Sequence, residues 1–363
     1  MHEWLERTGG SENVFEALSE IFPSAARYCL WNNSGGRFEG VEESVLARGP
    51  LRGRKSLALP FMPAAWRLLP NADLDWVLCS NHAFAHHARF RGPGADAPKL
   101  VYAHTPARYV WVPELDGRGG GLLARAASGV LRPIDRHRAQ EPIAIAANSA
   151  FVADRISRAW ERESTVIYPP VDVDYFTAAK DSDLTDSEIS LLEALPSEFV
   201  FGVSRLVPYK RLDHVIDTGV AVKMAVVIAG EGPDEARLRA LATASGADVR
   251  FIGKVSRAAL AWLYRRAAVV VFAPVEDFGI VAVEAMASGA PVLVHAVGGA
   301  SESVVDGSTG AVVARWAPEE LRSAVDRAMG TDRAARVRRA REFGADRFAE
   351  RIREWSAPYT GGA

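Results

Sequence analysis

The chain has 363 residues and a formal net charge of −2 at pH 7, with 43 Lys and Arg side chains against 45 Asp and Glu. This balance excludes a strongly basic surface for nucleic acid, and no apolar run reaches the roughly 18–20 residues that a membrane-spanning helix needs. The two cysteines, Cys29 and Cys79, stand in apolar runs, so we expect buried thiols in a reducing cytoplasm.

The first half of the chain alternates short apolar runs with amphipathic segments. Helices are predicted over about 12–21 and 122–141. Strands are predicted at residues 27–31, 75–79, 100–103, 142–147 and 165–168. The pair Gly9-Gly10 opens the first helix, yet nothing before it is long or apolar enough for a full strand. We therefore expect the first strand of this half to be truncated at the recorded start.

The second half has a more regular pattern after a polar, acidic segment at 177–197, which predicts a linker. Strands are predicted at residues 199–204, 224–229, 249–252, 268–273 and 291–295, with helices at about 210–222, 234–245, 256–267 and 279–288. This alternation indicates βαβ units on a parallel sheet that is buried on both faces.

The length and this pattern together predict two doubly wound α/β domains. The first covers residues 1–197 including the linker, and the second covers 198–340. We expect the remaining segment, 341–363, to be helical and to pack back toward the N-terminal domain.

Polar residues directly follow several strands of the second half, where ligands bind on parallel sheets. Arg205 and Lys210 follow one strand, and both cations suit a diphosphate. Glu276 follows another strand, and Glu284 lies eight residues later on the helix that Gly279 opens. Each feature alone is more often an ordinary surface charge. Their occurrence on successive strand ends predicts a nucleotide-diphosphate site without a Walker lysine loop.

A series of stretches, in order and over nearly the whole chain, resembles the GT-B glycosyltransferases of the large retaining family 4 group. They are Gly9-Gly10-Ser-Glu12, Tyr102-Ala-His104-Thr-Pro106, Ala147-Asn148-Ser149, Tyr168-Pro-Pro-Val171, Val203-Ser-Arg205 with Lys210, Gly230-Glu231-Gly232, and Glu276 to Glu284 followed by Ala285-Met-Ala-Ser-Gly289. The resemblance implies two Rossmann-like domains that face each other across a cleft. It also implies transfer of a sugar from a nucleotide diphosphate sugar to an acceptor hydroxyl, with retention at the anomeric carbon.

The same resemblance implies roles for individual residues. Arg205 and Lys210 match the diphosphate-binding pair, Glu284 matches the ribose ligand, and Glu276 matches the carboxylate that contacts the donor sugar. His104 matches the active-site histidine and completes a predicted catalytic set of Glu276, His104, Arg205 and Lys210. The predicted donor-binding set further includes Gly9, Gly10, Gly230, Glu231, Phe278, Gly279, Ile280, Val281 and Glu284.

The stretches around His104 and Glu276-Asp-Phe-Gly279 also resemble bacterial mannosyltransferases of polysaccharide assembly, which implies GDP-mannose as the donor. The implied acceptor is a glycan, a lipid-linked sugar or a small molecule. Two alternatives stay open: a family 4 enzyme that uses a UDP-sugar on a small-molecule or natural-product acceptor, and a nucleotide-sugar 2-epimerase on the same fold. The acceptor site is expected mainly on the loops at about 33–70 and 112–130.

Several aspartates and histidines have spacings that could bind a metal ion, but we favour structural roles for them. The Asp-x-Asp pairs at 73/75, 172/174 and 181/183 fit turns and helix caps, so we expect no cofactor and no essential metal. His82 and His86 have the i, i+4 spacing of a helical zinc site, with His87 beside them, but no third ligand is evident. We expect these histidines at the surface or in the acceptor site.

The first half also carries a basic run of Arg48, Arg52, Arg54 and Lys55. A solvated face is the favoured interpretation. The alternative is peripheral contact with the inner face of a membrane, as many relatives act on lipid-linked sugars.

Overall fold

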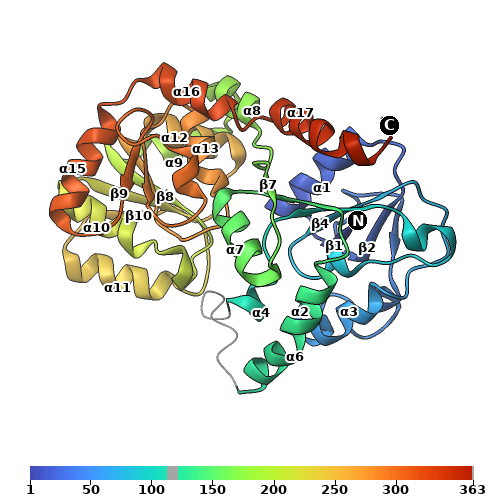
Figure 1. The fold of residues 1–363 in the computed structure, drawn as a ribbon. Coiled ribbons are helices and arrows are strands. Elements are labelled where there is room, and N and C mark those ends of the chain that lie inside the picture. Colours follow the sequence, from blue (N-terminus) through green and yellow to red (C-terminus); the bar gives the residue numbers. More distant parts are fainter. Residues whose placement is uncertain (113–121, 362–363) are drawn as a thin grey trace. The chain divides into compact units, whose positions relative to one another are not determined.

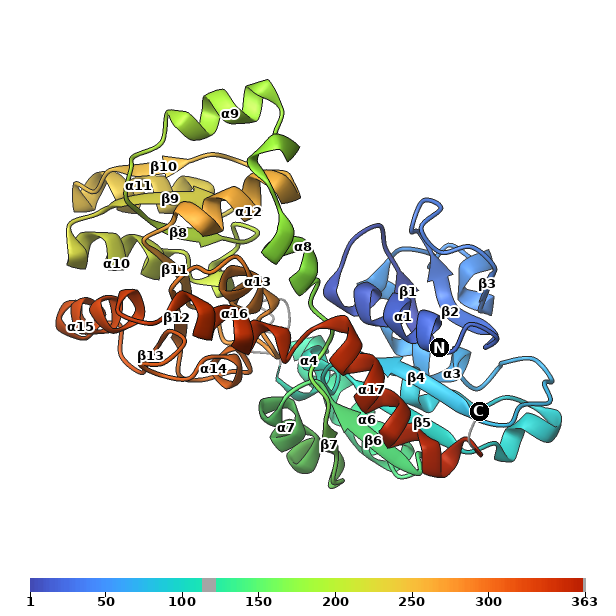
Figure 2. The ribbon, with the colours of Figure 1, turned by 90° about the horizontal axis from the view of Figure 1, so that it is seen from above.

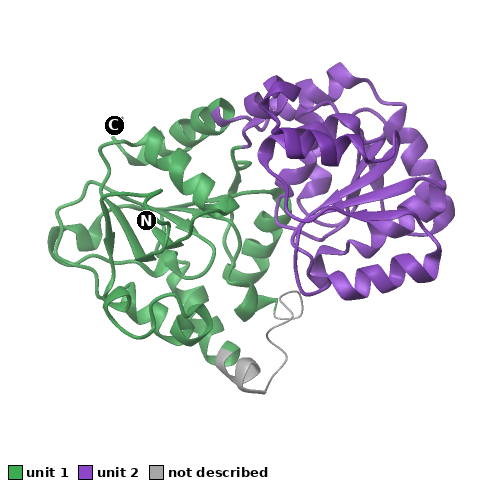
Figure 3. Ribbon diagram, turned by 180° about the vertical axis from the view of Figure 1, so that it is seen from behind, with its two compact units in different colours: residues 1–170, 346–363 green, residues 171–345 purple. Residues whose placement is uncertain are grey.

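The computed structural model describes residues 1–112 and 122–361 and divides the chain into two compact units. Unit 1 is Met1–Pro170 with Asp346–Ala363, and unit 2 is Val171–Ala345 (Figure 3). The boundary therefore lies at residue 170 and not at 197, because the segment expected as a linker packs within unit 2. In that segment Thr185 and Glu188 form a capping box that starts a helix at Asp186.

Unit 1 is built on a seven-stranded parallel sheet of strand order β3-β2-β1-β4-β5-β6-β7. The strands are β1 His2–Leu5, β2 Arg27–Asn32, β3 Val41–Glu43, β4 Val77–Asn81, β5 Lys99–Ala103, β6 Ala144–Ala147 and β7 Thr165–Val166. The order runs outward in both directions from β1 and β4, so the topological switch point lies between these two strands.

The strand β1 is present and central in the sheet, although the sequence pattern did not indicate a strand before Gly9. All four of its residues are buried, and it pairs in parallel with β2 and β4 in the middle of the sheet. The sequence concealed it because two of the four residues, His2 and Glu3, are polar, whereas a central strand usually reads as an apolar run.

Helices cover both faces of the unit 1 sheet. They are α1 Gly10–Ile21, α2 Lys55–Ala58, α3 Met62–Ala65, α4 Arg108–Trp111, α6 Leu122–Arg138, α7 Ala150–Trp160 and α17 Ala345–Ser356. On one face α17 lies beside α1, where Phe348 and Ile352 pack against Leu18 and Tyr102 (Figure 2). A larger apolar cluster under α3, α6 and α7 fills the other face.

Unit 2 contains a six-stranded parallel sheet of order β10-β9-β8-β11-β12-β13. Its strands are β8 Phe199–Val203, β9 Ala225–Ala229, β10 Val249–Phe251, β11 Val269–Phe272, β12 Val292–His295 and β13 Ala311–Val313. Here the switch point lies between β8 and β11, which are neighbours in the sheet although they are distant in sequence.

The helices of unit 2 pack on both faces of this sheet. They are α8 Val173–Ala178, α9 Asp186–Glu193, α10 Asp213–Val222, α11 Glu235–Ser245, α12 Arg257–Arg266, α13 Ile280–Ala287, α14 Ala300–Ser303, α15 Pro318–Met329 and α16 Arg333–Arg341. The pair α10 and α15 covers one face, and α12 and α13 cover the other (Figure 1). None of the helices in the described residues is long and apolar enough to cross a bilayer.

Candidate functional site

The switch point of unit 2 brings two of the predicted charged residues into contact. Lys210 follows β8 at the end of a short 3-10 turn, and Glu276 follows β11. The Lys210 Nζ donates to Glu276 Oε1 at 2.7 Å, and the side chains are 16% and 19% exposed. Arg205, on the same loop as Lys210, is exposed and donates through Nη2 to the Tyr209 hydroxyl at 3.0 Å. Its charge therefore faces solvent at the end of β8.

Two glycines allow the loop after β9 to pack closely against the loop after β8. A Cβ at Gly230 would lie 1.8 Å from the carbonyl oxygen of Ser204, and one at Gly232 would lie 2.3 Å from that of Leu206. Only glycine permits such an approach between two backbones. The Leu206 N–H also donates to the backbone oxygen of Glu231 at 2.9 Å, while the Glu231 side chain is exposed.

The loops after β11 and β12 meet in the same way. Gly279 has φ +91°, and a Cβ there would lie 2.6 Å from the Cβ of Ala300. A Cβ at Gly299 would lie 2.0 Å from the Asp277 carbonyl oxygen, and the Gly299 N–H donates to the Glu276 carbonyl at 2.8 Å. Glycines thus hold the backbone around Glu276 in one arrangement.

The helix α13 begins at Ile280, directly after this loop. The first N–H groups of a helix, here from Ile280 and Val281 onward, lack partners within the helix and attract anions. Phe278 is 4% exposed and its ring packs 5.5 Å from that of Phe343, so its side chain contributes to the core. The predicted contribution of residues 278–281 to donor binding therefore rests on their backbone.

Glu284 lies on α13 in a largely apolar surrounding. Burial raises the pKa of its carboxyl to about 7, although a hydrogen bond from the Tyr264 hydroxyl at 3.2 Å opposes the rise. Tyr264 comes from α12 and is fully buried. Sequence reasoning missed Tyr264 because a tyrosine on the apolar face of a helix resembles any core aromatic residue. The pair leaves Glu284 poised between its neutral and ionised forms at neutral pH.

In unit 1, His104 follows β5 and is 8% exposed. Its Nε2 shares a hydrogen bond with Ser80 Oγ at 2.9 Å, and the same hydroxyl contacts His2 Nδ1 at 3.0 Å. The predicted active-site histidine is therefore held by a chain of polar groups that crosses from β5 through β4 to β1.

The glycine loop between β1 and α1 is covered by a carboxylate. Glu12 is 4% exposed, and its Oε2 accepts a hydrogen bond from the Ser11 hydroxyl at 2.8 Å. The same oxygen lies 2.0 Å from where a Cβ on Gly9 would stand. Binding of a phosphate at Gly9 and Gly10 would therefore require the Glu12 side chain to move.

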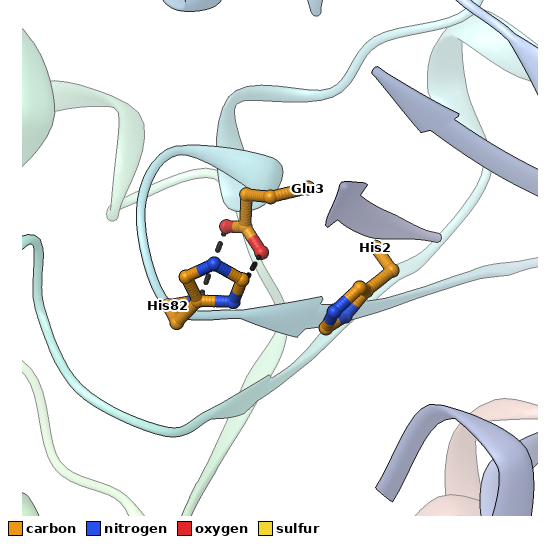
Figure 4. A group of neighbouring side chains, drawn as sticks. All are labelled: His2, Glu3 and His82. Atoms are coloured by element: carbon orange, nitrogen blue, oxygen red, sulfur yellow. Dashed lines mark hydrogen bonds and ion pairs between the residues drawn. The ribbon is translucent and has the colours of Figure 1, made fainter. Parts of the chain in front are cut away.

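Glu3 and His82 form a polar cluster with His2 (Figure 4). Glu3 Oε1 accepts hydrogen bonds from the backbone N–H groups of His82, Ala83 and Ala85 at 3.0, 2.8 and 3.0 Å. Burial opposes ionisation of Glu3, but its contacts with His82, His2 and the Ala85 N–H hold the pKa of the carboxyl well below its usual range. No sequence pattern marks His2 or Glu3 as a site residue.

His86 and His87 are buried, so the expectation of surface or acceptor-site histidines is wrong for both. Their Nε2 atoms lie 3.3 and 3.1 Å from Oδ1 of the buried Asp135. The other oxygen, Oδ2, accepts the indole N–H groups of Trp111 and Trp160, each at 2.7 Å. Asp135 thus has donors on both oxygens and joins α6 to α4, to α7 and to the 3-10 turn after β4.

The predicted site residues therefore fall into two groups. Unit 2 holds Arg205, Lys210, Gly230, Glu231 and the segment 276–284, and unit 1 holds His104, Gly9 and Gly10. Of the loops expected to bind the acceptor, residues 113–121 lie outside the described residues.

Two family models match the chain, one on each unit. The model "Glycosyltransferase Family 4" matches residues 8–175, and "Glycosyl transferases group 1" matches residues 186–344. The divide between these matches falls close to the boundary between units 1 and 2.

Curated relatives include D-inositol 3-phosphate glycosyltransferase of Mycobacterium avium, which is 36% identical over 158 residues, or 41% of this chain and 37% of the relative. The match thus spans just over a third of that relative's length. Glycogen synthase of Mycobacterium tuberculosis is 29% identical over 304 residues, or 75% of this chain and 70% of the relative.

Solved structures of similar fold cover nearly the whole chain. HepE of Anabaena in complex with UDP-glucose has a TM-score of 0.70 at 20% identity, with 98% of this chain and 99% of HepE covered. Sucrose-phosphate synthase of Thermosynechococcus elongatus has a TM-score of 0.71 at 17% identity, with 100% and 96% covered. At these identities the likeness concerns the fold, which is GT-B.

Proposed function

Since this chain combines a glycosyltransferase family 4 domain with a glycosyl transferases group 1 domain in a GT-B fold, we propose that it is a retaining hexosyltransferase. It moves a hexosyl unit from a nucleotide diphosphate sugar to an acceptor hydroxyl during glycan, glycolipid or polysaccharide synthesis. The observation that carries the proposal is the Lys210–Glu276 pair at the switch point of unit 2, where a cation and a carboxylate converge among glycine-packed loops.

The chemistry follows from the charges that develop during transfer. When the bond to the sugar breaks, negative charge grows on the leaving diphosphate and positive charge grows on the sugar ring. Arg205, Lys210 and the first N–H groups of α13 stabilise the leaving group, and charge stabilisation of this kind is usually the largest catalytic contribution. Glu276 turns from Lys210 to the hydroxyls of the donor sugar. His104 of unit 1 acts near the transferred sugar.

Retention fits a front-face route in which the leaving phosphate accepts the proton of the acceptor hydroxyl. We assign no side chain as a covalent nucleophile. Because two cations and a helix N-terminus supply positive charge at the diphosphate, we propose that transfer needs neither a metal ion there nor an organic cofactor. Glu284 accepts hydrogen bonds from the ribose hydroxyls, and Gly9 and Gly10 approach the donor phosphates.

The base and the sugar of the donor distinguish two candidates. GDP-mannose is the first candidate, on the resemblance of the Glu276-Asp-Phe-Gly279 loop. A UDP-hexose is the second, because a structure of similar fold, HepE, is described with UDP-glucose. A thermal-shift panel with GDP, UDP, ADP and dTDP separates them, since a nucleotide stabilises the fold in proportion to its occupancy.

Activity is tested by following the release of nucleoside diphosphate from GDP-mannose and UDP-glucose, with and without a pool of acceptor sugars and polyprenyl-linked sugars. The proposal is supported if nucleoside diphosphate is released only in the presence of an acceptor. The anomeric configuration of the transferred sugar should then be the same as in the donor. Conversion of the donor sugar without any acceptor would instead identify an epimerase and overturn it.

We further propose that the chain works in the cytoplasm with peripheral contact to the inner face of a membrane. The segment 45–68 exposes Leu57, Phe61 and Leu68 at 57%, 54% and 57%. Arg48 and Arg54 of this segment have no ion-pair partner among the described residues, so their charges are available to anionic lipid. Arg52 and Lys55 pair with acidic side chains and contribute less.

Co-sedimentation with vesicles of anionic and zwitterionic lipid tests this contact. The double variant Leu57→Asp, Phe61→Asp should lose binding to anionic vesicles. Leu191→Asp is the matched control, because Leu191 is also an exposed apolar residue, at 42%, but lies in unit 2. Absence of wild-type binding even to anionic vesicles would remove the proposal without affecting the transferase assignment.

A further inference from the structure

Three side chains at the switch point of unit 1 converge with one potential ligand atom each, His2 Nε2, Glu3 Oε2 and His82 Nδ1. His2 Nε2 has no hydrogen-bond partner within the part of the chain that the structure describes, and Glu3 Oε2 and His82 Nδ1 form an ion pair with each other. One potential ligand atom from each residue lies within 4.8 Å of those from the other two (Figure 4). Glu3 Oε2 and His82 Nδ1 are only 3.1 Å apart.

Such a group is costly if nothing else binds to it. A buried polar atom without a partner costs about 1–3 kcal/mol, and folded proteins pair the large majority of them. Here the partnerless His2 Nε2 converges with the Glu3–His82 ion pair, and two of the residues, His2 and Glu3, have no exposed surface. All three atoms are types that donate electron pairs to metal ions. Their convergence therefore indicates a cation.

In two of the three side chains the other polar atom is already held. His2 Nδ1 contacts Ser80 Oγ at 3.0 Å, which leaves Nε2 for a ligand. Glu3 Oε1 is occupied by three backbone N–H groups, which leaves Oε2. Metal ligands in proteins typically have their second polar atom fixed in this way, because it sets the orientation of the first.

We propose that His2, Glu3 and His82 bind one divalent transition-metal ion of the zinc type. Two imidazole nitrogens and one carboxylate oxygen suit Zn²⁺, whereas Mg²⁺ prefers oxygen ligands alone. In a tetrahedral zinc site the ligand atoms lie about 3.4 Å apart, given Zn–N bonds of roughly 2.0–2.1 Å. The 3.1 Å separation of Glu3 and His82 is close to that value. His82 is 19% exposed, so water can complete the coordination.

The second histidine cluster of unit 1 does not have these properties. Both oxygens of Asp135 contact donors from His86, His87, Trp111 and Trp160, and none of these atoms is left without a partner. That cluster is a closed structural network. The His2–Glu3–His82 ion would instead join β1 to the turn at 82–85, beside the Ser80–His104 contact.

The test is titration of the full chain, stripped with a chelator, by isothermal calorimetry with Zn²⁺ and separately with Mg²⁺. One equivalent of Zn²⁺ should bind, and Co²⁺ should give the intense visible absorption of a tetrahedral site. His82→Gln should weaken Zn²⁺ binding by at least tenfold. His137→Gln is the matched control, because His137 is an exposed histidine of the same unit, and its binding should equal that of the wild type.

His82→Gln is chosen because His82 is the least buried of the three ligands, and circular dichroism checks that the variant folds. Ser80→Ala gives a second readout, since loss of a group that orients a ligand typically weakens metal binding by about 10–100-fold. Absence of stoichiometric Zn²⁺ binding, or equal binding by wild type and His82→Gln, would overturn the site. Neither result bears on transferase activity, which is measured separately.

Discussion

Lys210 and Glu276 lie 66 residues apart in sequence and meet at 2.7 Å at the switch point of the unit 2 sheet. Without a bound donor their charges neutralise each other. A diphosphate sugar offers each a better partner, because its phosphates attract the ammonium group and its hydroxyls donate to the carboxylate. The ion pair therefore keeps two donor ligands in place and exchanges partners when the donor binds.

This exchange predicts the effect of removing the lysine. Lys210→Ala should lower kcat/KM for the nucleotide sugar by about 10²–10³-fold, the usual cost of losing one group that stabilises a transition-state charge. Steady-state kinetics measures the loss. Lys180→Ala, which removes an exposed lysine of the same unit, should leave the kinetics unchanged. Near-normal turnover by Lys210→Ala would contradict the leaving-group role.

The double variant refines this prediction. In Lys210→Ala the partly buried Glu276 carboxylate loses its partner and repels the diphosphate. Adding Glu276→Gln removes that repulsion, so the double variant should bind nucleoside diphosphate more tightly than Lys210→Ala alone, although it stays inactive. Additive losses in the two single variants would show that the residues act independently.

Glu284 makes nucleotide binding depend on pH. Burial raises the pKa of the carboxyl to about 7, so its protonated and ionised forms are both populated near neutral pH. Ribose hydroxyls donate hydrogen bonds to the ionised carboxylate. The affinity for nucleoside diphosphate is therefore highest well above pH 7 and falls as the pH drops through 7. The dissociation constant should be about tenfold larger at pH 6 than at pH 8. Calorimetric titration with GDP or UDP at several pH values measures it.

Two variants separate Glu284 from other titrating groups. Glu284→Gln should bind weakly with little pH dependence over this range. Tyr264→Phe removes the hydrogen bond that favours the ionised carboxylate, so the fall in affinity should begin at higher pH than in the wild type. A pH profile that Tyr264→Phe leaves unchanged would show that Glu284 is not the titrating group.

Gly279 should tolerate no side chain. Its φ of +91° strains any other residue by about 1–2 kcal/mol, and the Cβ would stand 2.6 Å from that of Ala300. Overpacking of this kind adds about 1–3 kcal/mol. Gly279→Ala should therefore lower the melting temperature and abolish the nucleotide-induced shift. Gly246→Ala has a similar φ of +68° but open space around it, so it should cost only the backbone strain.

The unit 2 fold could be predicted largely because its central strands are continuous apolar runs, such as Val269–Phe272, buried on both faces. Lys210 and Glu276 could be named individually from their positions after strands. Their contact could not, because it depends on β8 and β11 being neighbours in the sheet. The strand order is set by the tertiary fold and not by local pattern.

In unit 1 the missed features all involve polar residues satisfied from far away in sequence. Glu3 in β1 is buried because it binds backbone N–H groups about 80 residues away. His86 and His87 read as surface residues until Asp135, nearly 50 residues later, is placed against them. A buried polar residue and an exposed one have the same sequence signature, so only the three-dimensional partner distinguishes them.

The Asp135 network predicts how unit 1 loses stability. In Asp135→Asn the new amide N–H group faces either the two indole N–H groups or the histidines, so at least one hydrogen bond is lost. A hydrogen bond to a charged group contributes about 1.5–3 kcal/mol, and the free energy of unfolding should fall by that amount or more. Urea unfolding followed by tryptophan fluorescence measures it. Asp154→Asn, on an exposed ion pair with Arg158, should cost less than about 0.5 kcal/mol.

The same network predicts a stability loss at acid pH. Burial and the neighbouring His86 lower the pKa of His87 to about 4, against the raising effect of Asp135. The unfolded chain takes up a proton at this histidine near pH 6.5, whereas the folded chain does not until about pH 4, so stability falls as the pH drops through this window. The pKa of Asp135 is held well below its usual range, and the stability it contributes is lost only below its unfolded value of 3.8. Lys99 also belongs to this surrounding, because its Nζ donates to the His86 carbonyl at 2.7 Å, and burial lowers its pKa. His87→Gln should therefore be less stable than the wild type at pH 7 but should show a shallower decline between pH 6.5 and 4, and parallel declines would place the acid sensitivity elsewhere.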